Sequence, residues 1–185
     1  MRRLILLGGM IVALAGAPAL AQFTIQLTNP MITAIEKGQT DTVKSMLLRG
    51  ESPNGVDTLG ESYLINATTA GRYEIAEALL KAGALVESID RFGNTALIRA
   101  AERGDTEIAV LLLKYRAKPD AQNKQGATAL MVAARRGAGD MVQALLDGKA
   151  DVNRSDYTGR RALTYARQSN RSNVVRMIQQ AGGKD

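Results

Sequence analysis

Apolar residues recur along the chain at the three- to four-residue spacing of a one-sided helix. Successive stripes lie 33 residues apart, and a shorter apolar stretch that ends near a glycine precedes each of them. Since such a stripe faces a core, the pattern predicts pairs of short helices that pack against neighbouring pairs. The stripes of the second helices are Ile75, Ala76, Leu79 and Leu80; Ile108, Ala109, Leu112 and Leu113; and Met141, Val142, Leu145 and Leu146.

Three further columns of residues repeat at the same period of 33. An Asp or Asn is followed three residues later by a glycine and four residues after that by a leucine. A fixed period of about 20 to 50 residues is typical of solenoids, whose units bury their apolar faces by stacking. The columns are Asp57, Asp90, Asn123 and Asp156; Gly60, Gly93, Gly126 and Gly159; and Leu64, Leu97, Leu130 and Leu163.

The two central units carry the most specific motifs. G-N-T-A-L-I-R-A-A-E-R-G-D-T-E-I begins at Gly93, and G-A-T-A-L-M-V-A-A-R-R-G begins at Gly126. Both contain a turn glycine, a Thr-x-Leu helix start, paired alanines and an inter-helix glycine. In these features the chain resembles the ankyrin-repeat family from about Leu27 to the C-terminus. The resemblance is to the exported bacterial type because of the N-terminus, which is described below. The resemblance implies an all-α solenoid of about five helix-turn-helix units with short turn tips: residues 23–56, 57–89, 90–122, 123–155 and 156–185.

Several columns predict where helices begin and end. Asn29, Ser62, Thr95 and Thr128 suit N-caps, with Pro30 at a first helical position, whereas Arg161 interrupts this column. A second column predicts positive φ after each first helix, because Gly and Asn tolerate that backbone: Gly38, Gly71, Gly104, Gly137 and Asn170. An alanine column allows close helix approach: Ala34, Ala67, Ala100, Ala133 and Ala166.

Four further positions depart from the 33-residue repeat. Arg116 and Lys149 replace a glycine that follows the second helix as Gly50, Gly83 and Gly182 in other units. If this position requires a left-handed backbone, each replacement costs about 1 kcal/mol. Arg167 and Gln179 replace an alanine and a leucine in the last unit, where a solenoid needs a polar outer face. We therefore interpret Arg167 and Gln179 as C-terminal capping residues.

The N-terminus predicts export. Arg2 and Arg3 precede an apolar run from Leu4 to Ala17 and an Ala-x-Ala site, which together are typical of a signal peptide over residues 1–21, leaving one domain over residues 22–185. The alternative is an uncleaved membrane anchor, but the run of about 14 apolar residues is shorter than the roughly 20 needed to span a bilayer. Export of a chain with no cysteine favours a bacterial periplasm.

The composition argues against catalysis. The chain has no His and no Cys, so the usual general bases, nucleophile pairs and metal-ligand clusters are missing. It contains no P-loop and no dinucleotide-binding glycine motif after a strand. Glu107 and Asp140 lie at the starts of second helices, where the helix dipole favours a carboxylate. We therefore expect a protein that is not an enzyme and needs no cofactor or metal.

The ankyrin resemblance implies that the turn tips and the exposed ends of the first helices line a concave groove for a protein partner. In this chain the middle of that groove is basic, with Glu102 as the acidic exception. Arginine and aromatic residues are frequent at interface hot spots, so an acidic protein surface is the expected partner. A solvated face that keeps the protein soluble is the alternative. The candidate residues are Arg91, Phe92, Arg103, Lys124, Arg135, Arg136, Tyr157 and Arg160.

Three classes of function fit this description. The first is a periplasmic protein-binding module, which we expect to be monomeric and to have no stable membrane insertion after signal cleavage. The second is an inhibitor or immunity-type protein that blocks an exported toxin or enzyme through the same groove. The third is polyanion binding, which predicts a steep loss of affinity with salt. Export argues against nucleic acid, and without Arg2 and Arg3 the net charge falls from +6 to +4.

Overall fold

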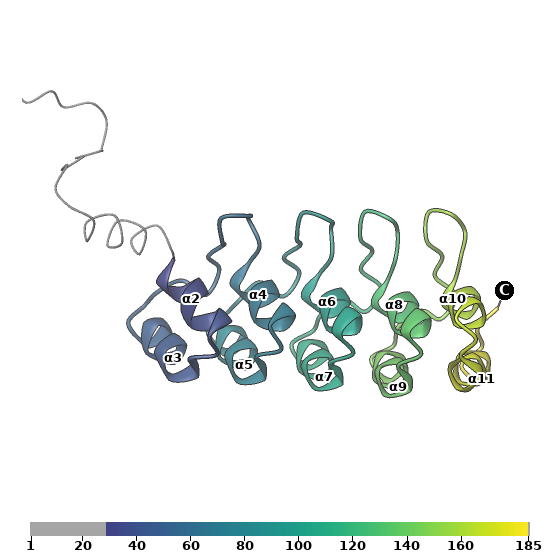
Figure 1. The fold of residues 1–185 in the computed structure, drawn as a ribbon. Coiled ribbons are helices and arrows are strands. Elements are labelled where there is room, and N and C mark those ends of the chain that lie inside the picture. The colour runs from purple at the N-terminus through teal and green to yellow at the C-terminus, as the bar shows by residue number, and fades with distance from the viewer. Residues whose placement is uncertain (1–28, 185) are drawn as a thin grey trace, which may run out of the picture.

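The computed structural model describes residues 29–184, which form ten α-helices. The helices follow one another as five pairs, stacked side by side in chain order (Figure 1). Within the described residues there is no β-strand, only three isolated bridges across the turn tips. The prediction of an all-α solenoid is therefore confirmed. The expected signal peptide, residues 1–21, and the expected start of the first unit at residue 23 lie outside the described residues.

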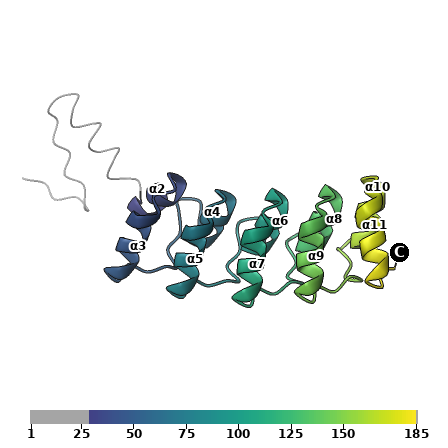
Figure 2. The same cartoon turned by 90° about the horizontal axis from the view of Figure 1, so that it is seen from below.

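The two helices of each pair belong to two parallel rows (Figures 1 and 2). The row beside the turn tips contains the first helices: α2 (Pro30–Glu36), α4 (Tyr63–Thr69), α6 (Ala96–Arg103), α8 (Ala129–Arg136) and α10 (Ala162–Gln168). The other row contains the second helices: α3 (Thr40–Leu48), α5 (Tyr73–Lys81), α7 (Thr106–Lys114), α9 (Gly139–Asp147) and α11 (Ser172–Gln180). Each helix packs on its partner in the pair and on the corresponding helix of the next pair.

The predicted N-caps form as expected. Asn29 Oδ1 accepts from the Met31 N–H at 2.9 Å, and Ser62 Oγ accepts from the Ile65 N–H at 3.3 Å. Thr95 and Thr128 cap α6 and α8 in the same way. At α10, where Arg161 interrupts the column, the bond runs the other way, because Thr164 Oγ1 accepts from the Arg161 N–H at 3.4 Å.

Both predicted columns of left-handed backbone are confirmed. Gly104 and Gly137 end α6 and α8 with φ of 78° and 73°, and Asn170 has φ of 53°. Arg116 and Lys149 each have φ of 66°, in the column where Gly50, Gly83 and Gly182 have φ between 88° and 90°. The two basic residues therefore hold a backbone conformation that favours glycine.

The core is one continuous layer between the helices of neighbouring units. The alanine column is buried throughout, as predicted, and so are the stripes of α5 and α9 apart from Leu146, which is half-buried. In α7 the stripe differs by one position, because Leu111 is buried and Leu113 is half-buried. Arg167 and Gln179 are exposed on the last unit, consistent with the capping role inferred for them.

The repeated Asp or Asn builds each turn tip. In the third unit, Asp90 Oδ1 accepts from the N–H groups of Phe92 and Asn94, both at 2.8 Å. The Gly93 N–H donates to the Asp90 carbonyl at 2.9 Å with φ of 78°, which explains the glycine column. The same arrangement recurs at Asp57, Asn123 and Asp156.

A further column, which the sequence analysis missed, ties each unit to the next. Its side chains accept a hydrogen bond from a backbone N–H about one unit further along the chain. The bonds join Asn54 to Leu85 at 2.7 Å, Glu87 to Lys118 at 2.9 Å, Asp120 to Asp151 at 2.7 Å and Asn153 to Lys184 at 2.8 Å. They satisfy loop N–H groups and fix the register of neighbouring units.

Candidate functional site

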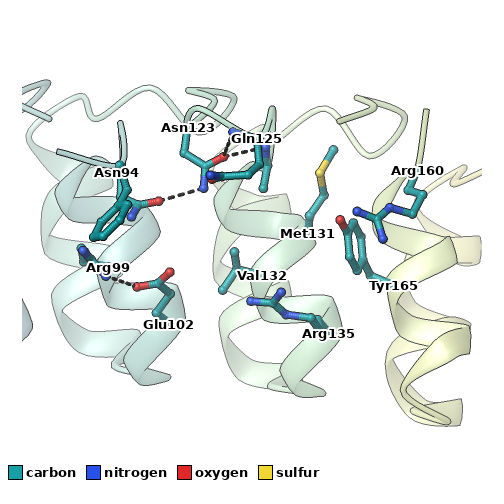
Figure 3. Close-up of a pocket in the computed structure, with 12 residues that line it drawn as sticks. Asn94, Arg99, Glu102, Asn123, Gln125, Met131, Val132, Arg135, Arg160 and Tyr165 are labelled. Carbon is teal, nitrogen blue, oxygen red and sulfur yellow. Dashed lines mark hydrogen bonds and ion pairs between the residues drawn. The ribbon is translucent and has the colours of Figure 1, made fainter. Parts of the chain in front are cut away.

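The turn tips and the first helices together form one side of the molecule, called the inner face below. A hollow of about 350 Å³ opens on it, lined by residues of the third, fourth and fifth units. Its lining comes from α6, α8 and α10 and from the turn tips before them (Figure 3). The hollow is therefore a product of stacking, because no single unit contains it.

A contact that repeats in three units explains why the hollow lies where it does. Asp57, Asp90 and Asp156 each contact the side chain nine residues further along, on the first helix of the same unit. These partners are Asn66 at 3.1 Å, Arg99 through an ion pair, and Tyr165 at 2.6 Å.

The fourth unit lacks this contact, because Val132 occupies the helix position opposite Asn123. Valine offers no polar atom, and Asn123 instead donates to Asn94 Oδ1 of the preceding unit at 2.8 Å. The side chains packed between Asn123 and α8 are consequently apolar, and the lining includes the buried Met131 and Val132 and the half-buried Ala127.

Arg99 pairs with both carboxylates on one side of the hollow, one positive charge shared between two negative ones. Its guanidinium pairs with Asp90 and also with Glu102, the latter at 2.7 Å. Burial acts to raise the pKa of Asp90, but hydrogen bonds from Asn94 and Phe92 and the charge of Arg99 outweigh it and lower that pKa. The carboxylate of Asp90 is therefore a charged, fully partnered structural group.

Asp156 is a second charged, partnered carboxylate, on the fifth-unit side of the hollow. It accepts hydrogen bonds from Thr158, Arg160 and Tyr165, with the Tyr165 hydroxyl at 2.6 Å. Burial acts to raise the pKa of Asp156, but these hydrogen bonds hold it well below the usual range of an aspartate. Burial, and next the bond to Asp156, raise the pKa of Tyr165. The Arg160 guanidinium lies 4.8 Å from the centre of the Tyr165 ring, so Arg160 is held over the edge of the hollow (Figure 3).

Three of the eight candidate residues line the hollow: Phe92, Arg135 and Arg160. Arg91 lies beside it on the third turn tip, with its guanidinium 4.9 Å from the centre of the Phe92 ring. Lys124 and Tyr157 lie on the next two tips, where their N–H groups donate to Phe92 and Gln125 carbonyls. Arg136 is exposed at the end of α8 and does not line the hollow.

Arg103 has a structural contact that its sequence position does not reveal. Its guanidinium donates to the Thr69 carbonyl of the preceding unit at 2.8 Å, near the end of α4. Arg72 contacts the Glu36 carbonyl in the same way at 2.8 Å. The side chain of Arg103 thus caps the C-terminal end of α4 by donating to one of its last carbonyls.

Sequence reasoning overlooked Arg99, Val132 and Tyr165. All three occupy the helix position nine residues after the repeated Asp or Asn, a column that also contains Asn66. The change from polar residues to valine in that column was the available signal. The nine-residue spacing by itself does not indicate a contact, because only the folded turn brings the two side chains of each pair together.

The cations of the inner face fall into two groups. Arg99 and Arg160 are paired with carboxylates, and Arg103 with a carbonyl. The exposed side chains of Arg91, Lys124, Arg135 and Arg136 make no hydrogen bond or ion pair with any residue from 29 to 184. Positive charge without a carboxylate partner in the described residues therefore comes from these four residues and from Arg103, whose bond to a neutral carbonyl leaves its charge in place.

Neither a metal centre nor a membrane span is found in the described part of the chain. Residues 29–184 contain no group of three His, Cys, Asp or Glu side chains that could hold a metal ion. None of the helices from α2 to α11 is long and apolar enough to cross a bilayer.

Comparison with protein families identifies the class of protein. The model of ankyrin repeats (3 copies) matches residues 31–123 and 97–185. These matches cover most of the chain, which therefore belongs to the ankyrin-repeat family. Ankyrin repeats are generally protein–protein interaction modules and are typically non-catalytic. No curated protein matches the sequence significantly.

Proposed function

We propose that this protein is a non-catalytic binding module of the bacterial periplasm that docks on an acidic protein surface through its inner face. The observation that carries the proposal is the group of four exposed, uncompensated cations around the hollow: Arg91, Lys124, Arg135 and Arg136. Cations without an internal carboxylate attract a partner of opposite charge and set its orientation. Phe92, which is 45% exposed beside them, adds an apolar contact.

Charge reversal on the inner face tests this proposal. Arg135 and Arg136 are changed to Glu, and the variant is compared with the wild type in affinity capture from a periplasmic extract. Both side chains are exposed, so stability should change by no more than about 0.5 kcal/mol. Affinity for the captured partner should fall on the order of a hundredfold.

The matched control places the same change of charge on the second helices. Lys44 on α3 and Lys114 on α7 are exposed and also unpaired within residues 29–184, so Lys44→Glu with Lys114→Glu should leave capture unchanged. Binding by the wild type should weaken with ionic strength, and the loss caused by Phe92→Ala should not depend on salt. The inner face is not the binding surface if the Lys44/Lys114 variant loses the partner while the Arg135/Arg136 variant keeps it.

An inhibitor or immunity-type function would use the same face. The two functions differ in what binding does to the partner, so the captured protein is assayed with and without the module. Loss of a toxin or enzyme activity on binding supports inhibition, whereas unchanged activity supports a docking role. A steep loss of affinity with salt and no captured protein supports polyanion binding instead.

A further inference from the structure

The floor of the hollow differs chemically from the rest of the inner face. Val132 replaces the polar partner that the turn-tip Asp has in the second, third and fifth units. Met131 and Ala127 lie beside it in the lining, and the half-exposed Phe92 ring forms a wall. The apolar side chains of the floor favour an apolar side chain of a partner, whereas the surrounding cations favour a carboxylate.

The charges around this floor are unequal. On the third-unit side, Arg99 is paired with Asp90 and Glu102, and on the fifth-unit side Arg160 is paired with Asp156. Arg135, on the same helix as Val132, lines the hollow and has no hydrogen bond or ion pair within the described residues. Val132 and Arg135 both lie on α8, between the Arg99–Glu102 pair and Tyr165 (Figure 3). A carboxylate that enters the hollow therefore finds Arg135 available.

We propose that the hollow accepts one aromatic or large aliphatic side chain from an acidic segment of the partner, and that a neighbouring carboxylate of that segment pairs with Arg135. This inference rests on the proposed function and adds the chemistry of the bound segment. A volume of about 350 Å³ is at the low end of the range for binding pockets, which suits one large side chain. The lining includes the turn-tip residues Phe92 and Gln125, over which the rest of an extended segment would lie.

The two interactions have different physical roles. Exposed charges at the edge of an interface mainly set orientation and association rate, whereas an apolar anchor that fills a hollow contributes much of the affinity. The proposal therefore predicts that bound segments share an apolar residue with Asp or Glu within about two positions. Acidic residues without the anchor should bind weakly.

Selection from a random heptapeptide display library tests the inference on the mature full-length chain. The wild type should enrich peptides with an aromatic or large aliphatic residue next to Asp or Glu. The Val132→Tyr variant should fill the hollow, because Val132 has the position that Tyr165 has in the fifth unit, where the Tyr165 hydroxyl donates to Asp156. Its affinity for an enriched peptide should fall at least about tenfold. The matched control is Val110→Tyr on α7, where Val110 is 51% exposed, and it should bind as the wild type does.

Two further variants keep the test decisive if Val132→Tyr melts at a lower temperature than the wild type. Phe92→Ala removes the wall at an exposed tip and should cause a loss of similar size. Arg135→Glu should weaken binding about tenfold at low salt and less at high salt, whereas Lys114→Glu should not.

Each outcome separates the inference from the function on which it rests. The inference is supported if the enriched peptides combine an acidic with an apolar residue and if the Val132→Tyr and Arg135→Glu variants both bind them weakly. Enrichment of purely acidic peptides, with binding that depends on Arg135 but not on Val132 or Phe92, overturns the anchor and leaves the basic face standing. Absence of any enriched motif also overturns it, while the Arg135/Arg136 capture experiment still decides the proposed function.

Discussion

Arg116 and Lys149 occupy left-handed backbone, each with φ of 66°. A side chain with a Cβ is strained there by about 1 kcal/mol. We predict that Arg116→Gly and Lys149→Gly each raise the free energy of unfolding by about 0.5 to 1 kcal/mol, since relief of strain outweighs the added freedom of the unfolded chain. Urea denaturation measures this effect. Lower midpoints in both variants would show that the two side chains make contacts worth more than the strain.

Asp156 gives stability a dependence on pH. Its carboxylate is almost fully buried and accepts hydrogen bonds from Thr158, Arg160 and Tyr165. We predict that Asp156→Asn lowers the free energy of unfolding by about 1 to 3 kcal/mol at neutral pH, because an amide cannot accept all of these bonds.

The sign of the pH effect follows from the lowered pKa of Asp156 in the folded state. As the pH falls, Asp156 takes up a proton in the unfolded chain before it does so in the folded protein. The stability that the Asp156 carboxylate contributes is therefore complete above about pH 5 and declines below about pH 4. Asp90, whose pKa is also lowered, contributes in the same direction. Urea midpoints measured from about pH 6 to pH 2 should therefore fall less in Asp156→Asn than in the wild type. If the urea midpoints of the two proteins fell equally with pH, Asp156 would not be a source of the pH dependence.

At the scale of the helices, each pair is stable only against its neighbours. α10 packs on α8 and α11 packs on α9, so the last unit covers the fourth while presenting Arg167 and Gln179 to solvent. We predict that deletion of residues 156–185 exposes the apolar side of the fourth unit, including Leu145 and Leu146. The shortened protein should aggregate or bind a hydrophobic dye. A monomeric truncation with a cooperative melting transition would contradict the capping role.

At the scale of the whole molecule, stacking turns isolated cations into one surface. Arg91, Lys124 and Arg135 come from different turn tips and helices, and the constant geometry of the units brings them onto one face. Long, nearly one-dimensional arrays of this kind offer extended surfaces for binding. The proposed partner is accordingly a macromolecule, because the hollow is shared by three units and its lining includes residues of the exposed turn tips.

The proposed location is tested on the whole protein. If residues 1–21 are a signal peptide, the mature chain begins at Gln22, because the Ala-x-Ala site ends at Ala21. N-terminal sequencing of protein from a periplasmic fraction should find Gln22 first. Intact Met1 in a membrane fraction would overturn the periplasmic assignment.

Much of the fold follows from local sequence. The 33-residue columns predicted the helix pairs, and Thr95, Thr128 and Gly104 predicted their ends. Capping and positive φ are properties of a few neighbouring residues, so a single chain segment determines them. Even Arg116 and Lys149 were identifiable, because a departure from a glycine column has a local meaning.

Tertiary structure alone decided which side chains are paired. Asp90 and Arg99 are nine residues apart, and only the turn brings them into contact. Arg103, a candidate for binding by its column, instead contacts the Thr69 carbonyl of the preceding unit. The sequence determined the helices, the caps and the excess of positive charge, because these depend on residue type and spacing. The stacking of units determined which charges are compensated and where Val132 leaves an apolar hollow, because those properties depend on contacts between distant residues.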